Sequence, residues 1–303
     1  MNWVEGQANP LIQPPFPSLL IADPTFLPSA MTPDQQWHLF AHSLMGIHHF
    51  TSPDGNAWTR HRGLVSALSL RPFLFIDGLR YYLFYEKVLG LNPFPQSRME
   101  VRVSTDLWKW SAPTTIMEPS LPWHREGGHY GNVGNPCVIR DDQGFRLYYS
   151  AGLVYLKDCR FCEPKYIGIA TSPTLTGHYL PRTSPILQPD PDDPYMNLGA
   201  GAIKVVQTVD GYVGFQNGIY WDPVQDHSGS AIRLLHSPDG DQWTIPKKEP
   251  ILKPGKGWKK SHVYALDIRR VEGQWRFYFN ARSGWLTGRE GIGYAIGTRP
   301  EGL

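Results

Sequence analysis

The amino-acid sequence predicts an all-β protein, and three observations carry that prediction. Gly and Pro account for 30 and 28 of the 303 residues, and they interrupt the chain too often for long helices. Aromatic residues are abundant (11 Trp, 15 Tyr and 13 Phe) and only 18% of residues are charged, which excludes a disordered chain. Short phrases also recur along the whole sequence, as expected for a fold built from repeated sheets.

The first recurring phrase is a strand that runs into a tight turn. It contains Ser or Thr, often followed by Pro-Asp-Gly, and an aromatic residue a few positions later. Pro-Asp-Gly favours a tight turn between antiparallel strands, and we expect the aromatic ring to pack back onto the sheet. Four copies and a degenerate fifth lie at residues 50–58, 103–110, 170–179, 236–243 and 295–300.

A strand rich in Tyr, Phe and Leu precedes each of these turns. Four of these strands follow a turn that ends in Gly, which is expected to join each of them to a strand just upstream, as at residues 72–76 and 136–140. The five aromatic strands span residues 37–42, 81–86, 145–150, 212–217 and 275–280.

A third phrase supplies an outer strand. Pro-Ile-Leu-x-Pro follows the turns at residues 184–189 and 249–254, with a looser version at 115–119. Short strands flanked by Pro belong at sheet edges, where a missing N–H is tolerated. A similar phrase opens the chain at residues 9–14, whereas the last repeat ends without one. We therefore expect the N-terminus to complete the last sheet.

Five four-stranded units with this closure predict a five-bladed β-propeller, with residues 1–303 forming a single domain. A β-sandwich is the alternative architecture. It would require neither five repeats nor a displaced terminal strand.

Charge, termini and cysteines exclude several classes of partner. The chain has 29 basic and 27 acidic residues, and its densest basic run (Lys256, Lys259 and Lys260) lies in a Gly-flanked turn, so no nucleic acid is expected. The N-terminal residues do not resemble a signal peptide, and no run of ~18 apolar residues occurs, so a cytoplasmic protein with no membrane partner is expected. Cys159 and Cys162 form one Cys-x-x-Cys without a second pair, so we expect loop cysteines, no metal and no cofactor.

One rim of the predicted propeller collects polar and aromatic residues. In each unit, the end of the second strand and the start of the first share that rim, and the second strands end in His42, Glu86, Ser150, Asn217 and Asn280. Connections at this rim are expected to be long loops, at residues 87–98, 151–165, 218–229 and 281–290, and they carry aromatic residues that include Trp221 and Trp285. Such loops on a rigid scaffold build small-molecule sites, and their aromatic faces favour a carbohydrate ligand.

These features resemble a known group of proteins. Asp23-Pro24 at the start of the first inner strand, the Ser-Pro-Asp-Gly-x-x-Trp turns and the Pro-Ile-Leu-x-Pro phrases are similar to those of the five-bladed glycoside hydrolases, of both the arabinanase/β-xylosidase-like and the invertase-like families. The resemblance implies a glycosidase in which Asp23 is the base or nucleophile at the cavity floor. The remaining family carboxylates are replaced: Asn135-Pro136 and Arg71-Pro72 lack the expected Asp, and residues 198–202 lack a Glu.

Glycoside hydrolysis also requires an acid that protonates the leaving oxygen. Glu86 is the first candidate, because burial at the end of its strand would raise its pKa; alternatively, it is a structural carboxylate paired with Arg71. His262, which opens the last repeat, is the second candidate, since some members of the group that this chain resembles use a histidine; alternatively, it is a hydrogen-bonded core residue. Asp267 lies further along its strand and is expected to be a residue of the sheet twist or of an ion pair.

Further polar and aromatic residues are expected around the cavity mouth. Two of them, Glu126 and His129, lie on the loop that enters the third unit. The candidate substrate-binding residues are His42, Arg71, Glu126, His129, Asn135, Asn217, Trp221, Tyr264, Asn280 and Arg282. Two functions other than hydrolysis stay open. One is a glycoside phosphorylase in which Arg71, Arg282 and His129 hold phosphate. The other is a carbohydrate-binding or repurposed propeller that has lost the acid.

Overall fold

The computed structural model describes residues 3–90, 96–128, 130–142, 144–247 and 249–297. These residues form an all-β fold, as predicted, with three short 3-10 helices at Ser29–Met31 (η1), Pro122–Arg125 (η2) and Gly257–Lys259 (η3). None of the described helices is long and apolar enough to cross a membrane. His129 and the last part of the fifth turn phrase, 298–300, lie outside the described residues.

The strands fall into five consecutive groups. The first contains β2 (Ala22–Leu27), β3 (Trp37–Ser43), β4 (Gly46–Ser52), β5 (Thr59–Arg60) and β6 (Ser66–Ala67). The second contains β7 (Ser69–Asp77), β8 (Arg80–Gly90), β9 (Gln96–Ser104) and β10 (Thr114–Met117). The third contains β11 (Val133–Asp141), β12 (Gly144–Leu156), β13 (Phe161–Ser172) and β14 (Leu180–Pro181). The fourth contains β15 (Gly199–Thr208), β16 (Gly211–Asp222) and β17 (His227–Ser237). The fifth contains β18 (His262–Val271), β19 (Gln274–Arg282) and β20 (Glu290–Gly297), and β1 (Trp3–Glu5) pairs with β20.

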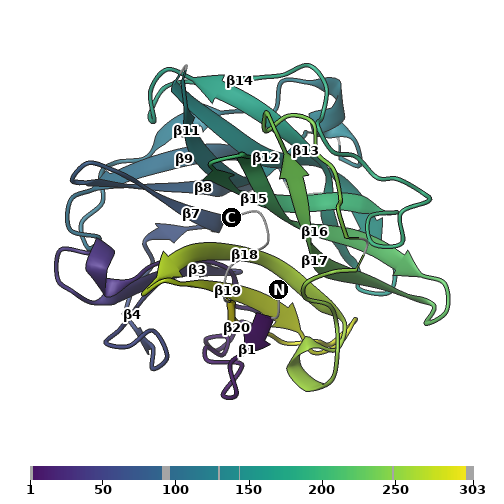
Figure 1. Cartoon of the computed structure of the whole chain (residues 1–303), viewed down its shortest axis with the longest axis horizontal. Coiled ribbons are helices and arrows are strands. Elements are labelled where there is room, and N and C mark those ends of the chain that lie inside the picture. Colours follow the sequence, from purple (N-terminus) through teal and green to yellow (C-terminus); the bar gives the residue numbers. More distant parts are fainter. Residues whose placement is uncertain (1–2, 91–95, 129, 143, 248, 298–303) are drawn as a thin grey trace.

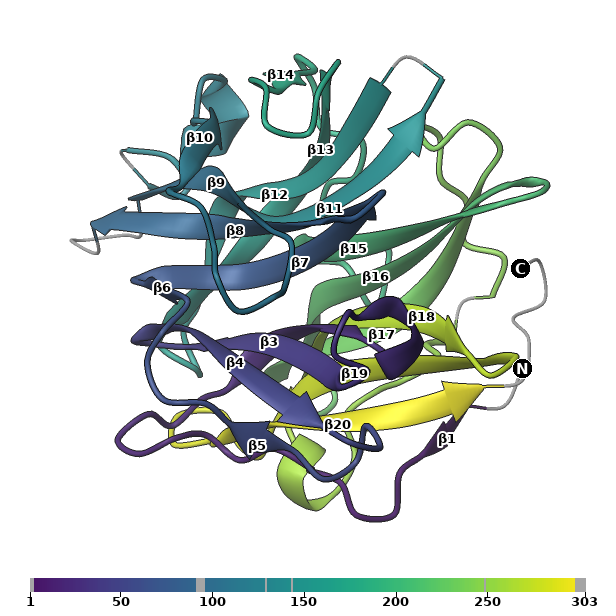
Figure 2. The ribbon, with the colours of Figure 1, turned by 90° about the vertical axis from the view of Figure 1, so that its left-hand side faces the viewer.

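Strands within each group pair antiparallel with their neighbours in sequence, except that β6 pairs with β4, and the groups follow one another in space. Figure 2 shows β3 and β4, then β7 and β8, then β11 and β12 in sequence order. The first strands of the groups contact one another in a cycle: β2 lies against β7, β7 against β11, β11 against β15, β15 against β18, and β18 against β2. A single parallel pair, Ser230 with His262, joins the fourth group to the fifth.

The N-terminal strand joins the last group, but through different residues from those expected. Figure 1 shows β1 beside β20 although they come from opposite ends of the chain, and Trp3 pairs with Gly297. The phrase at 9–14 makes only an isolated bridge, Ile12 with Ile292, much as Leu187 and Leu252 do in the third and fourth groups. Proline has no N–H to donate, so the flanking prolines limit these segments to one bridge each.

The aromatic residue of the turn phrase packs on the preceding group of strands. The sequence predicted instead that the ring would pack on the sheet to which its own turn belongs. Trp58 contacts Tyr278, with ring centroids 5.6 Å apart, Trp110 contacts Phe40 at 5.7 Å, and Trp243 contacts Tyr148 at 6.1 Å. All three pairs are edge-to-face, an arrangement that contributes about 0.5–1.5 kcal/mol beyond the buried area. The repeated aromatic therefore joins one sheet to the next, and Trp58 joins the first group to the last.

Three of the connections predicted as long loops contain extended hairpins. β12 and β13 stay paired as far as Leu156 and Phe161, and β16 and β17 as far as Asp222 and His227. β8 likewise continues to Gly90. The β12–β13 and β16–β17 segments are rich in β-branched and aromatic residues, such as Val154, Tyr155 and Tyr220, which favour strands. The connection between Arg282 and Glu290 is an irregular loop, as expected.

Beneath the rim, charged side chains link the inner strands. Asp267 accepts hydrogen bonds from the Thr25 hydroxyl (2.8 Å) and the Phe26 amide (3.1 Å), and it pairs with Arg269 at 3.2 Å. The Lys204 ammonium donates to the Pro136 carbonyl at 2.7 Å. The ion pair expected for Asp267 is therefore present within β18, and the hydrogen bonds from Thr25 and Phe26 to Asp267 join β18 to β2.

Five buried histidines are held in the neutral form by the fold. Burial, as the main cause, lowers the pKa of His48 and His124 to about 4 and that of His49 and His262 to about 3, and it also lowers the pKa of His38. In the unfolded chain these groups bind protons near pH 6.5, so below that pH the unfolded state holds more protons than the folded state. The free energy of unfolding therefore falls as the pH drops from 6.5 toward 4.

We expect the denaturant midpoint to be clearly lower at pH 5 than at pH 7.5, each histidine contributing up to about 1.4 kcal/mol per pH unit. Glu163 and Glu290 act in the opposite sense because burial raises their pKa values, but two carboxyls do not offset five histidines. His49→Gln should reduce the pH dependence, and the exposed His178→Gln should leave it unchanged. Equal midpoints at the two pH values would contradict this expectation.

Candidate functional site

A central cavity of about 450 Å³ opens at the rim where the sequence placed the site. Residues from all five groups line it. Leucines, among them Leu70 and Leu153, form part of the wall, and the aromatic lining consists of Phe161 and Tyr264. The polar lining includes Asp23, His42, Arg71, Glu86, Asn135, Glu163, Asn217, Asn280, Arg282 and Glu290. The cavity is thus a mixed surface with four carboxyl groups and two guanidinium groups.

A β-bulge at the same place in every first strand shapes the polar floor. In β2, β7, β11, β15 and β18 the pairing register shifts so that one extra residue stands against the second strand. Asp23, Arg71 and Asn135 occupy this position with positive φ angles of 49°, 53° and 51°. Each is followed by a proline, which fits here because a bulge interrupts the hydrogen-bond ladder. Bulges commonly re-aim a side chain beside a functional site, and here three of the re-aimed residues line the cavity.

Asp23 is held as a carboxylate. His42 Nε2 lies 2.8 Å from Asp23 Oδ2, and the Asp23 amide donates to Asn280 Oδ1 at 3.0 Å. Burial by itself would raise the pKa of Asp23, but the hydrogen bond and charge of His42, together with Arg71 and Lys204, lower it overall. Asp23 is therefore ionised at neutral pH.

His42 is oriented by two acceptors. Its Nδ1 lies 3.3 Å from the Ser43 carbonyl oxygen, and its Nε2 faces the Asp23 carboxylate. Both ring nitrogens of His42 therefore face acceptors, which fixes the orientation of the ring beside Asp23. Asn280 connects Asp23 to Glu290. Its Oδ1 accepts from the Asp23 amide, and its Nδ2 donates to Glu290 Oε2 at 3.1 Å.

Glu86 makes the ion pair expected of a structural carboxylate. Its Oε2 lies 2.5 Å from an Arg71 guanidinium nitrogen, and its side chain is 1% exposed. The carboxyl also packs against Gly134, where an added Cβ would come within 2.0 Å of Glu86 Oε2. Arg71 and Gly134 together fix Glu86 at the wall of the cavity.

Two carboxyls in the cavity, Glu163 and Glu290, were not among the candidates. Glu163 lies on β13 opposite Val154. Burial raises its pKa to about 8; Arg71 opposes the rise, and the Glu290 and Asp23 carboxylates add to it. Glu290 pairs with Arg282 at 3.2 Å, and burial raises its pKa as well. Glu163 is therefore protonated at neutral pH in the same cavity where Asp23 is ionised.

Sequence reasoning missed Glu163 because residues 151–165 were expected to form a loop. In a loop, Glu163 has no defined direction, whereas in a strand paired with Val154 its side chain is fixed toward one face. Glu290 carried a usable signal, since it ends the loop whose other end is Arg282 and the two residues pair across β19 and β20.

Three candidates lie away from this cavity. His262 is fully buried, with Nε2 3.4 Å from the Ser228 hydroxyl, and it does not line the cavity. Glu126 forms an ion pair with Lys165 on the surface of the third group. Trp221 lines a second cavity between the fourth and fifth groups. The other predicted residues, except His129, which the structure does not describe, come together in the central cavity.

Within the described part of the chain, no group of three or more His, Cys, Asp or Glu side chains is arranged to hold a metal ion. Cys137 and Cys159 are buried free thiols, and Cys162 is half-buried at the cavity wall.

Comparison with solved structures defines the class of fold. A β-1,2-mannobiose phosphorylase from Listeria innocua superposes with a TM-score of 0.65 at 12% identity, over 97% of this chain and 96% of that one. An α-L-arabinanase from Cellvibrio cellulosa, solved with arabinohexaose, gives a TM-score of 0.65 at 14% identity, over 93% and 94%. An N-acetylgalactosamine deacetylase from F. plautii, in complex with blood group B trisaccharide, gives 0.65 at 13%, over 92% and 89%.

The chain therefore has the propeller fold of glycoside hydrolases and their relatives, which confirms the resemblance found in the sequence at the level of fold. No protein-family model matches the sequence, and no curated protein matches it.

Proposed function

We propose that this protein is a glycoside hydrolase that cleaves a glycosidic bond in the central cavity. The five strand groups act as the blades of one five-bladed propeller domain, closed by β1 on β20. Asp23 serves as base or nucleophile and Glu163 as the general acid. The combination of an ionised and a protonated carboxyl in one cavity carries this proposal.

Hydrolysis of a glycosidic bond requires those two protonation states. The ionised carboxylate attacks the anomeric carbon or takes a proton from water, while the protonated carboxyl gives its proton to the leaving oxygen. Environments that push two carboxyl pKa values in opposite directions assign the two roles. Asp23 is lowered by His42, and Glu163 is raised to about 8 by burial, so each is in the required form near pH 7.

The rest of the cavity supports a neutral, hydroxyl-rich substrate. Asn135 and Asn217 are nearly buried in its wall, and Asn217 Oδ1 has no hydrogen-bond partner among the described residues. A buried polar atom without a partner is available to a ligand hydroxyl. Leucines and Phe161 cover the C–H faces of a sugar ring.

Phosphorolysis is disfavoured by the pairing of the cavity cations. Arg71 is bound to Glu86, and Arg282 is bound to Glu290 and to the Gly284 and Trp285 carbonyl oxygens. A phosphate dianion would have to displace these partners and lie beside several carboxyl groups. Water needs no such rearrangement.

A screen of p-nitrophenyl glycosides, with and without inorganic phosphate, tests the proposal. We expect release of the free sugar from at least one glycoside, at a rate that phosphate does not increase. The anomer released first distinguishes a base, which gives inversion, from a nucleophile, which gives retention.

Formation of a sugar 1-phosphate would overturn hydrolysis in favour of the phosphorylase. No turnover of any glycoside in either buffer, with sugars still bound, would favour the carbohydrate-binding propeller.

A further inference from the structure

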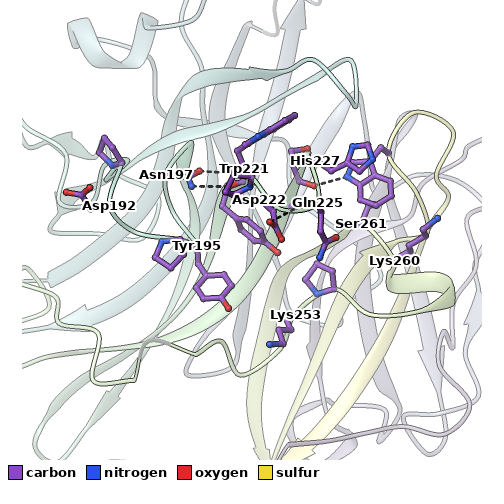
Figure 3. A pocket seen from close by; sticks show the side chains of 18 residues that line it. Asp192, Tyr195, Asn197, Trp221, Asp222, Gln225, His227, Lys253, Lys260 and Ser261 are labelled. Carbon is purple, nitrogen blue, oxygen red and sulfur yellow. Dashed lines mark hydrogen bonds between the residues drawn. The ribbon is translucent and has the colours of Figure 1, made fainter.

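A second cavity, of about 520 Å³, lies on the same rim between the β16–β17 hairpin and the loop after β19. Figure 3 shows Tyr195 and Trp221 on one side of it and His227 and Lys260 on the other. None of its lining residues lines the central cavity. The catalytic machinery proposed above therefore does not account for it.

Aromatic rings make up much of its wall. Tyr195 and Tyr220 are edge-to-face, with centroids 5.4 Å apart, and His227 stacks on Trp285 at 4.1 Å. Trp221 completes the set and is half-buried. The central cavity, by contrast, contains only Phe161 and Tyr264 among the described aromatic residues. The rim aromatics that the sequence associated with sugar binding are thus gathered mainly here.

The backbone that carries these rings is held in place by partly buried polar contacts. The Asn197 side chain makes two hydrogen bonds with the Trp221 backbone, accepting from its amide at 2.7 Å and donating to its carbonyl at 3.1 Å. The Trp285 indole N–H donates to the Ser228 carbonyl at 2.7 Å. These contacts are made within the protein itself and fix the backbone of both walls.

The segment that carries Tyr195 is fixed by a buried ion pair. Both oxygens of Asp193 accept from one Arg233 guanidinium nitrogen, at 2.8 and 2.7 Å, and Arg233 is 2% exposed. A buried, charge-assisted pair of this kind holds a segment more firmly than a surface contact. The Asp193 carboxylate also accepts from the Tyr195 amide at 2.8 Å, which connects the ion pair directly to the wall.

The polar groups of this cavity suit a neutral ligand with many hydroxyls. Acidic and basic side chains are mixed, with Asp192 and Asp222 against Lys253 and Lys260. Such a lining offers both donors and acceptors without a net charge that would select an anion or a cation. Flat rings together with mixed polar groups are the surface that a sugar ring requires.

The second cavity adjoins the central one across a single loop. Residues 283–289 place Trp285 in the second cavity, whereas Leu286 and Gly288 line the central cavity. We propose that the second cavity binds sugar units of an oligosaccharide whose other end lies in the central cavity. The choice of a sugar as the ligand rests on the proposed function. A second sugar site would define the substrate as an oligosaccharide and not a single glycoside.

Calorimetric titration tests this inference with sugars of different length. The cleavage-impaired Asp23→Asn protein is titrated with the methyl glycoside and the hexasaccharide of arabinose, xylose, mannose and galactose. We expect at least one hexasaccharide to bind at least tenfold more tightly than its methyl glycoside. Adding Trp221→Ala should lower that ratio about tenfold, because a stacked aromatic ring is removed.

Two further variants separate binding from folding. Trp221→Tyr keeps a ring and should retain most of the ratio. Tyr155→Ala removes an exposed aromatic of the same rim that lines neither cavity, and it should leave the ratio unchanged.

The inference is overturned if every hexasaccharide binds no more tightly than its methyl glycoside, or if Trp221→Ala leaves the ratio intact. The glycoside screen is independent of Trp221. If glycosides are hydrolysed but Trp221→Ala leaves the ratio of hexasaccharide to methyl glycoside affinity unchanged, only the proposal of a second sugar site is overturned. If that affinity ratio depends on Trp221 but no glycoside is hydrolysed, only the proposed hydrolysis is overturned.

Discussion

Asp23→Asn is expected to lower kcat for glycoside hydrolysis by at least about 10³-fold. The substitution keeps the shape of the side chain and removes the negative charge that attacks the anomeric carbon or activates water. Asn also tolerates the positive φ of 49° at this position, so the bulge should be preserved. The measurement is kcat with the best p-nitrophenyl glycoside, alongside thermal unfolding to establish that the variant is folded.

A small anion provides a further check of the role of Asp23. In Asp23→Ala, the space left by the carboxylate should admit azide or formate, and either ion should restore part of the activity. Asp77→Asn serves as a control, because Asp77 is a half-exposed carboxylate paired with Arg140. A folded Asp23→Asn protein with near wild-type kcat would show that Asp23 is not the base or nucleophile.

Glu163→Gln is expected to lower kcat by about 10²–10⁴-fold for glycosides with poor leaving groups. A 2,4-dinitrophenyl glycoside should be affected far less, since its leaving group departs without being protonated. In the wild-type protein, kcat/KM should fall above about pH 8, where Glu163 loses its proton. That alkaline limb should be absent from the residual activity of Glu163→Gln. The measurement is a pair of pH–rate profiles with two leaving groups.

Glu86→Gln is the matched comparison, because Glu86 lines the same cavity but is paired with Arg71. It should lower activity by a similar factor for both leaving groups, since it disturbs the position of Arg71 and not proton transfer. A strong leaving-group dependence in Glu86→Gln and none in Glu163→Gln would reverse the two assignments.

Much of the scaffold could be predicted from short-range patterns. Ser52 and Asp54 show why: the Ser52 hydroxyl and the Asp54 carboxylate accept hydrogen bonds from backbone amides within three residues, and Ser237 and Asp239 do the same. Such turns are encoded by the residues that form them. The target of each following aromatic could not be predicted in this way, since Trp58 packs on Tyr278, which comes from the far end of the chain.

The candidate site was predictable where it depends on strand ends. The predicted strands end at His42 and Glu86 and begin near Asp23 and Arg71 on the same rim, and these four residues do line one cavity. His262 also begins a first strand, but it is fully buried beside Ser228, outside the cavity. Residue order along a strand indicates a rim, whereas the direction of a side chain also depends on its neighbours.

The sequence by itself determined the central part of the strands, the turns and the five repeats, because these follow from local backbone preference and side-chain alternation. Only the tertiary structure decided which carboxyl carries a proton. The pKa of Glu163 reflects burial together with charges on Arg71, Glu290 and Asp23, which come from three other strand groups. An electrostatic environment is a sum over groups that are close in space, and most of the groups around Glu163 are far from it in the chain.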